Sequence, residues 1–418
     1  MAISISNRPD KTINSYDSYW VAVNNPVSFS FETTGSPLDD AVQVALFEVD
    51  GFTQIVELSI IPFPPSSVVT IDISSFIQSE TNSDDDSFTI QINADNVASN
   101  QFKVFRIGYR ADGSGSYTVD STEYIGVNNV KQALETYGGN LAKYVPDFDS
   151  SGPTAVNREG EFLSTLERPK IFWFSSNDSS SPPSNQVTTF YPSIAWILPE
   201  EYDGQSDYDV RTTKDGGGAV TGSFPLVSPA EKGMRYVNWR SSVPSNDDTY
   251  TAKTITTEIQ TTAGDCLVSP ISYDVVRVCN NPVAIKWKDK LGSWQIWVFE
   301  GDAVNGANVT SGDNVAIPYT DIATLSRSTK TLTKTEIPTL TVSANLLTKN
   351  EVIALQGIQT SPHVLLCVSD FRGITGEDAD DWASISVIDA TRPLYNERLA
   401  KYGIAFEFEL IESFTINN

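Results

Sequence analysis

Residues 41–61 read AVQVALFEVDGFTQIVELSII, and apolar and polar residues alternate on both sides of Gly51. Successive side chains of a β-strand point to opposite faces of a sheet, so this alternation is typical of a half-buried strand. A glycine between two such runs is typical of a hairpin turn. The stretch therefore predicts two antiparallel strands joined by a short turn.

The same period of two recurs along the chain. Short runs such as VSFSFET at 27–33 and FKVFRIGYRAD at 102–112 are separated by Gly, Pro, Asn and Asp at regular spacing. This spacing is typical of antiparallel sandwiches and barrels. We therefore expect a mostly β protein, built of consecutive antiparallel β-sandwich or barrel-like domains with few short helices.

Changes of composition predict how the 418 residues divide, and about three domains are expected from the length. Residues 1–128 are expected to form an N-terminal β-domain. Residues 129–160 hold a short helix, KQALETY, and a connector rich in Pro, Gly and Ser. Residues 161–262 are expected to form a middle β-domain, and residues 263–418 a C-terminal β-domain.

The C-terminal segment contains further predicted elements. Its sequence favours strands at 315–319, 329–335 and 337–343. SANLLTKNEVIALQGI then predicts a short helix around 349–356, because good helix formers follow a polar start. More strands are expected in HVLLCVSD, WASISVIDA and IAFEFELIESFTI.

The chain is strongly acidic, with 28 Lys and Arg residues against 53 Asp and Glu residues and a formal net charge of −25. Nucleic-acid binding needs basic groups that neutralise phosphates, and anionic membrane surfaces attract the same groups. We therefore expect no direct nucleic-acid binding.

No run approaches ~18 apolar residues, which predicts no membrane-spanning helix. The start, MAISISNRPDKT, lacks the apolar core of a secretory signal.

Residues that could carry catalysis or bind a metal are few. His363 is the single histidine, so a site with several histidines cannot form within one chain, and we interpret His363 as structural. No G-x-S-x-G motif surrounds a serine. Acidic residues gather in turn-like stretches such as Asp84–Asp86, Glu200–Glu201 and Glu377–Asp381, which ordinary solvated loops explain. The sequence therefore predicts no enzyme, no cofactor and no metal site.

The three cysteines are Cys266, Cys279 and Cys367. An odd and small number does not fit a disulfide scaffold. We interpret them as small buried residues of a chain made in a reducing cytosol, and a Cys266–Cys279 pair across a hairpin is the alternative.

The densest aromatic cluster is VAIKWKDKLGSWQIWVF at 283–299. It predicts a hairpin in which Trp297 and Phe299 point to one face of the second strand, and Trp294 points to the other with Ile296 and Val298. Because both faces are apolar, we expect this strand to lie in a domain core or at an interface with another domain or subunit. A sugar-binding aromatic platform is the alternative.

Three stretches resemble a known family. CNNPVAIKWKDKLGSWQIWVF at 279–299 resembles a Cys-x-x-Pro-(apolar)-x-Trp-x-Asn-x-x-Gly-Gly-x-(aromatic)-x-Trp-x-Phe signature. It occurs in β-rich virion proteins of tailed phages and prophages of Bacteroidota, including crAss-like phages. GEFLSTLERPKIFWFSSND at 160–178 resembles the entry into that family's middle domain. SPHVLLCV, Trp382 with SISVIDA, and IAFEFELIE resemble its closing strands.

The resemblance covers residues from about 120 to 418. The residues that carry it and are expected to be structural or interface residues are Pro282, Trp287, Gly292, Trp294, Trp297, Phe299 and Trp382. The chain departs from the signature at Lys288–Asp289, where the family usually has Leu-Asn, at Ser293, which replaces the second Gly, and at Gln295. At these positions the hairpin turn is expected to differ from that of the family.

The resemblance implies a location in the virion, after synthesis in the cytoplasm of a host bacterium, and no active site. We expect a structural protein that forms a ring or sleeve in a phage tail, collar or baseplate. Its expected partners are copies of itself in the ring and other phage tail or neck proteins. A net charge of −25 suits such a tail, because acidic walls repel passing DNA.

A receptor- or glycan-binding tail protein is the first alternative. It would contact a host surface glycan or receptor through loops at 79–87, 176–187 and 212–219. A glycan-degrading enzyme is less favoured, because no catalytic constellation is recognisable.

Overall fold

The computed structural model describes most of the predicted strands. The described residues are 2–9, 18–34, 41–49, 53–61, 67–81, 96–97, 102–111, 115–127, 141, 143–148, 155–175, 187–199, 207–215, 218–225, 233–237, 252–278, 282–300, 303–311, 314–316, 329–331, 333–367, 382–391, 393–396, 400–410 and 414–417. The predicted helix KQALETY lies outside them.

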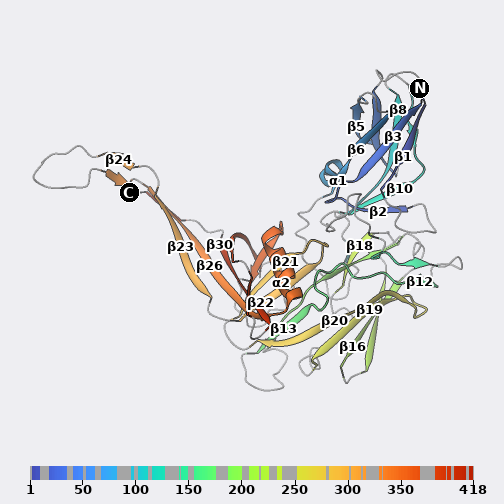
Figure 1. The fold of residues 1–418 in the computed structure, drawn as a ribbon. Coiled ribbons are helices and arrows are strands. Elements are labelled where there is room, and N and C mark those ends of the chain that lie inside the picture. The colour runs from blue at the N-terminus through green and yellow to red at the C-terminus, as the bar shows by residue number, and fades with distance from the viewer. Residues whose placement is uncertain are drawn as a thin grey trace, which may run out of the picture. The chain divides into compact units, whose positions relative to one another are not determined.

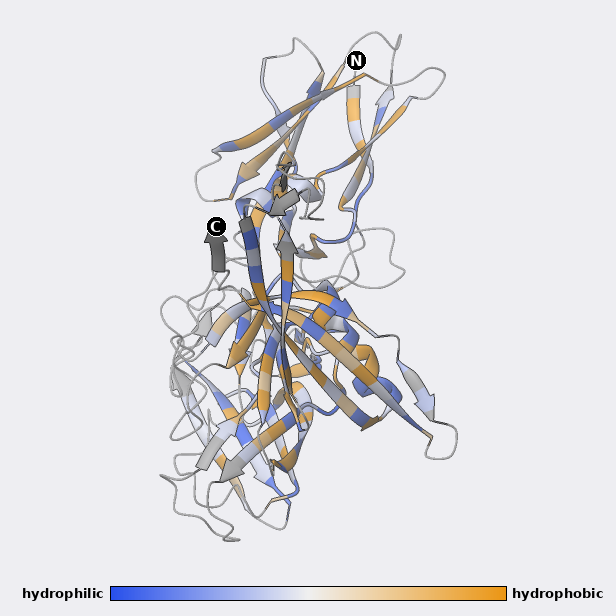
Figure 2. Ribbon diagram, turned by 90° about the vertical axis from the view of Figure 1, so that its left-hand side faces the viewer, coloured by the Kyte–Doolittle hydropathy of each residue, from blue (hydrophilic) through white to orange (hydrophobic). Residues whose placement is uncertain are grey.

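The protein is mostly β, as the period of two predicts, and nearly all of the strand pairs are antiparallel. In the described part of the chain the α-helices are α1 (Ser74–Glu80) and α2 (Lys349–Gln356), both short. Figure 2 shows hydrophobic and hydrophilic residues alternating along many of the strands. None of the helices in these ranges is long and apolar enough to cross a membrane.

The chain divides into two compact units. Unit 1 comprises Met1–Pro169, Tyr191–Val275 and Asp289–Trp294, and unit 2 comprises Lys170–Phe190, Val276–Lys288 and Gln295–Asn418. The predicted joint at 262/263 falls between two paired strands, β19 (Thr254–Gln260) and β20 (Cys266–Val278). The division into three β-domains stays a prediction.

The N-terminal part of unit 1 contains two sheets. One has the order β1-β3-β6, and the other is six-stranded with the path β2-β10-β8-β4-β5 and β9 beside β8. The hairpin predicted at 41–61 is confirmed, because β4 and β5 pair antiparallel from Val42↔Ile60 onward. The bounds are β1 (Ala2–Asn7), β2 (Ser18–Ala22), β3 (Ser28–Thr34), β4 (Val42–Glu48), β5 (Gln54–Ile60), β6 (Val68–Asp72), β8 (Phe102–Ala111), β9 (Thr118–Val119) and β10 (Glu123–Val127).

One buried cluster joins these two sheets. Phe29 and Phe31 of β3 meet Val44 of β4, Ile107 of β8 and Tyr124 of β10 in it. The alternate residues of each strand that face this cluster are the apolar ones, which is why the sequence shows a period of two here.

The remainder of unit 1 is also made of antiparallel strands. Its sheets have the orders β15-β18-β7, β20-β19-β16-β17 and β11-β12. The bounds are β7 (Asn96–Val97), β11 (Asp147–Phe148), β12 (Val156–Arg158), β15 (Ile194–Leu198), β16 (Asp207–Lys214), β17 (Ala219–Pro225) and β18 (Gly233–Val237). All residues of β15 and β18 are buried, and Trp196 packs edge-on against Tyr208 at 5.1 Å between ring centroids.

Unit 2 is built around a nine-stranded sheet with the path β22-β21-β27-β28-β30-β26-β23, in which β29 pairs with β30 and β31 with β26. Figure 1 labels β21, β22, β23, β26 and β30 of this sheet. Its bounds are β21 (Val283–Lys288), β22 (Trp294–Phe299), β23 (Val304–Ser311), β26 (Thr333–Leu347), β27 (Val364–Cys367), β28 (Trp382–Ala390), β29 (Leu394–Asn396), β30 (Lys401–Leu410) and β31 (Phe414–Asn417). Two pairs accompany it, β13 (Lys170–Ser175) with β14 (Val187–Phe190), and β24 (Asn314–Ala316) with β25 (Thr329–Thr331).

Helix α2 begins where the sequence predicts. The Thr348 hydroxyl accepts a hydrogen bond from the backbone N–H of Glu351, and the Glu351 carboxylate accepts one from the backbone N–H of Thr348. This capping box satisfies two donors of the first turn. Val352 and Leu355 are then buried in the core of unit 2.

Candidate functional site

The candidate site is the Trp-rich hairpin, and the structure confirms that these residues form a hairpin. Strand β21 pairs with β22, and every residue of β22 is buried within the chain itself. The exposed fraction is 0 % for Trp287, 4 % for Trp294, 5 % for Trp297 and 2 % for Phe299. These rings therefore pack in the interior, and none of them offers an exposed platform on which a sugar could stack.

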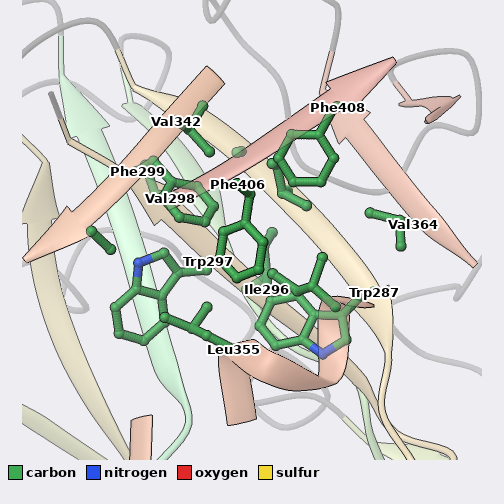
Figure 3. Close-up of a cluster of buried hydrophobic side chains, with 14 of the residues drawn as sticks. Trp287, Ile296, Trp297, Val298, Phe299, Val342, Leu355, Val364, Phe406 and Phe408 are labelled. Carbon is green, nitrogen blue, oxygen red and sulfur yellow. The ribbon is translucent and has the colours of Figure 1, made fainter. Parts of the chain in front are cut away.

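The hairpin strands supply much of the core of unit 2. Figure 3 shows Trp287 of β21 and Ile296 to Phe299 of β22 converging with side chains from β26, β27, β30 and α2. Phe299 packs edge-on against Phe406, with ring centroids 6.0 Å apart. The hairpin is therefore the element onto which the closing strands of unit 2 pack.

The indole of Trp297 has a charged neighbour. Lys170 Nζ lies 4.3 Å from the centroid of the ring, and Phe172 packs edge-on against the same ring at 5.6 Å. Lys170 also forms an ion pair with Glu351, the capping residue of α2. Burial by itself would raise the pKa of the Glu351 carboxyl, but the hydrogen bonds from Lys170 and Thr348 outweigh it and lower that pKa.

Two further signature residues flank the hairpin in unit 2. Pro282 is buried and directly precedes β21. Trp382 opens β28, is half-buried, and lies edge-on to Phe190 at 6.4 Å, with Lys286 Nζ 5.7 Å from its ring centroid. Strand β27 lies between the hairpin and β28 in the sheet, and Trp382 pairs with Cys367 of β27 and packs there as a structural residue.

The turn of the hairpin belongs to unit 1, and Asp289 organises it. Its Oδ1 accepts hydrogen bonds from the backbone N–H groups of Leu291 at 2.9 Å and Ser293 at 3.0 Å. Its Oδ2 accepts from both the backbone N–H and the hydroxyl of Thr165, each at 3.0 Å. Gly292 has φ +87°, a conformation that favours glycine. A side chain that sequence reasoning noted only as a departure from the signature is therefore the centre of the turn.

Ser293, the second departure, ties the turn to neighbouring backbone in unit 1. Its Oγ accepts from the Ala195 N–H at 2.7 Å and donates to the carbonyl of Leu163. The Tyr236 hydroxyl donates to the Gly292 carbonyl at 3.1 Å. A glycine at 293 would leave the Ala195 N–H and the Leu163 carbonyl without this shared partner.

The structure thus brings together the three stretches that carry the resemblance. Leu163 and Thr165 of the 160–178 stretch contact the hairpin turn inside unit 1, and Lys170 and Phe172 contact Trp297 inside unit 2. The closing strands join through β27, where Ile285 pairs with Leu366. Thr165, Lys170 and Glu351 were not among the predicted site residues. The T-x-x-E spacing of Thr348 and Glu351 is a sequence pattern that predicts the helix cap. No sequence pattern points to Thr165.

Of the residues considered for chemistry, His363 has a backbone role. Its carbonyl accepts from the Lys288 N–H at 3.2 Å just before β27 begins. Within the described ranges no group of three or more His, Cys, Asp and Glu side chains could hold a metal ion. Asp84–Asp86, Glu200–Glu201, Glu377–Asp381, Cys279 and most of the loops at 79–87 and 176–187 lie outside the described residues. The stretch 212–219 is mostly described, and it includes the end of β16 and the start of β17, where Thr213 pairs with Ala219.

Comparisons with known proteins give no family. No family model matches the chain, and no curated protein matches it. One similar solved structure is the CsuC–CsuE chaperone–tip adhesion subunit pre-assembly complex from the archaic chaperone-usher Csu pili of Acinetobacter baumannii. That chain is 10 % identical, the match covers 62 % of this chain and 95 % of that one, and the TM-score is 0.14. A similarity at this TM-score carries no argument about fold or function.

Proposed function

We propose that the chain is a structural component of a tailed bacteriophage virion, a ring- or sleeve-forming tail, collar or baseplate protein that acts by oligomeric assembly. One observation carries the proposal: the stretches that resemble the virion family contact one another inside each unit. Asp289 and Ser293 bond to Thr165 and Leu163 in unit 1, and Trp297 packs on Phe172 in unit 2.

These side chains support a structural role because they are already engaged in packing and hydrogen bonds. The four aromatic residues of the hairpin are at most 5 % exposed, and the carboxylate of Asp289 already accepts four hydrogen bonds. Burying and bonding such groups stabilises a fold and fixes its shape. Well-packed units of this kind suit a repeated part of an assembly.

The charge of the chain supports the same role. A net charge of −25 gives a surface that repels DNA, as the wall of a DNA channel requires. The partners proposed are further copies of this chain and other tail or neck proteins of the virion.

Light scattering coupled to size-exclusion chromatography tests the proposal. We expect a discrete mass that is a whole multiple of 45.7 kDa and that persists on dilution. Because like charges repel, we also expect added salt to favour the assembled form. Mass spectrometry of virions from the phage that encodes this sequence should find the chain in many copies. A mass of 45.7 kDa at every concentration, together with its absence from virions, would contradict the proposal.

A further inference from the structure

Strands β23 and β26 of unit 2 form a long antiparallel ribbon (Figure 1). Their register runs from Val304↔Thr341 to Ser311↔Lys334 over the 8 residues of β23 without a shift. On its other side β26 pairs with β30 from Thr339 onward and with β31 over Thr333–Glu336. The ribbon is therefore held firmly along its inner strand.

Strand β23 is the outer strand of this ribbon. Within the described residues it pairs with β26 and with no other strand, so the backbone N–H and C=O groups of its far edge are free to bond. Residues 303–309 are all exposed, and Val304 and Val309 are each 58 % exposed. Such an edge is a template for pairing with another strand.

The edge lacks the features that usually keep two edges apart. Proteins protect long edges with charges, proline or a bulge. The sequence of β23, VNGANVTS, contains no charged residue and no proline, and its register shows no bulge. By contrast, the edge strand β5 carries Glu57, and its pairing with β4 shifts register beside Phe47 of β4. The edge strand β17 ends in Pro225. The unprotected edge of β23 is therefore expected to be covered in the assembled protein.

Charge indicates what covers it. Residues 303–347, which hold the ribbon and the segment that joins its strands, contain three acidic and three basic residues: Asp313, Asp321, Glu336, Arg327, Lys330 and Lys334. Their net charge is zero, whereas the whole chain carries −25. The ribbon can therefore approach another strongly acidic copy without the repulsion that the rest of the surface would meet.

We propose that the free edge of β23 adds as a strand to a second copy of this chain and so forms the contact between neighbouring subunits. This inference rests on the proposed function and deepens it. Backbone hydrogen bonds would supply the contact, and Val304 and Val309, which lie on opposite faces of β23, would each be covered by the added strand.

A charge placed on the edge tests this. Val309 faces Glu336 across the ribbon, so Val309→Lys places a lysine opposite a glutamate, and the ribbon should still form. The matched control is Ile388→Lys, which adds the same charge to an exposed position (43 %) of β28, an interior strand of the same sheet. Val309→Thr keeps a β-branched, uncharged residue at the edge. Circular dichroism and thermal melts check that all variants fold.

We expect Val309→Lys to raise the concentration needed for half-assembly at least tenfold, while Val309→Thr and Ile388→Lys assemble like the wild type. Cross-linking of mixed unlabelled and ¹⁵N-labelled chains should give inter-copy links from Lys334. If the wild type assembles but Val309→Lys does so equally well and Lys334 gives only intra-copy links, the edge contact is wrong and the proposed function stands. If the wild type remains monomeric, the proposed function fails and the edge contact with it.

Discussion

Asp289 Oδ2 lies 3.0 Å from both the backbone nitrogen and the hydroxyl of Thr165, a residue 124 positions earlier in the chain. The other oxygen of the same carboxylate bonds to the backbone of Leu291 and Ser293. One buried side chain thus closes the hairpin turn and anchors the 160–178 stretch to it inside unit 1. Charge-assisted bonds of this kind are stronger than neutral ones.

Replacing Asp289 by asparagine should destabilise unit 1. An amide can keep the turn bonds through its single oxygen, but its NH₂ group would then face the N–H of Thr165, which leaves a buried donor unpaired. We expect a loss of about 1–3 kcal/mol in the free energy of unfolding, measured by urea titration. Thr165→Val, which removes only the hydroxyl, should cost less. An unchanged midpoint for Asp289→Asn would show that the Thr165 bonds do not stabilise the fold.

Truncating Trp297 should destabilise unit 2. The ring is buried against Phe172 and under Lys170, so Trp297→Ala empties a large aromatic site. We expect a loss of ~3–5 kcal/mol. Ile353→Ala on α2, where the side chain is 48 % exposed, is the control and should stay within about 0.5 kcal/mol of the wild type. A thermal melt of Trp297→Ala that overlays the wild type would rule out the buried placement.

The Lys170–Glu351 ion pair predicts a loss of stability in acid. The folded pKa of Glu351 lies below its ordinary value of 4.5, so the unfolded chain binds more protons between the two values. The contribution of Glu351 is complete above about pH 4.5 and is lost as the pH falls through the lower, folded pKa. Glu351→Gln should flatten this part of the pH–stability curve, and Lys170→Gln should do the same. Curves of unchanged shape in both variants would contradict the assignment.

Cys266 should react slowly with alkylating agents. Burial, followed by the charges of Glu159 and Glu258, raises the pKa of its thiol to about 12, and the thiol donates to the Val268 carbonyl. Because the thiolate is the nucleophile, iodoacetamide at pH 8 should modify the tryptic peptide 254–277 more than tenfold more slowly in the folded protein than in urea. The raised pKa also means that this thiol's contribution to stability falls as the pH rises from about 9 toward 12. Equal rates in both states would show an accessible, unperturbed thiol.

Much of the fold follows from local pattern. The helix predicted around 349–356 is observed as Lys349–Gln356. Its start could be predicted because the capping residues Thr348 and Glu351 are close together in the sequence. The strands expected at 329–335 and 337–343 are instead β25 and one long β26 that runs through Pro338. Pro338 pairs with Ala307 of β23, and on the other side of β26 it lies between the residues that pair with β31 and those that pair with β30.

The rest required the three-dimensional structure. The Thr165–Asp289 and Lys170–Glu351 contacts join residues far apart in the chain. No sequence pattern predicts which of these residues pair. Helix α1 was not predicted, and its N-cap position, Ile73, makes no side-chain capping bond that could have marked its start. Distant side-chain pairing depends on how whole sheets pack, which a period of two does not encode.

Negative-stain electron microscopy of the purified chain tests the central claim most directly. If the chain is a ring- or sleeve-forming virion protein, the images should show closed rings or stacked rings of uniform diameter, more abundant at higher protein and salt concentration. Fields that contain only single particles of the size of one 45.7 kDa chain, at every concentration, would contradict it.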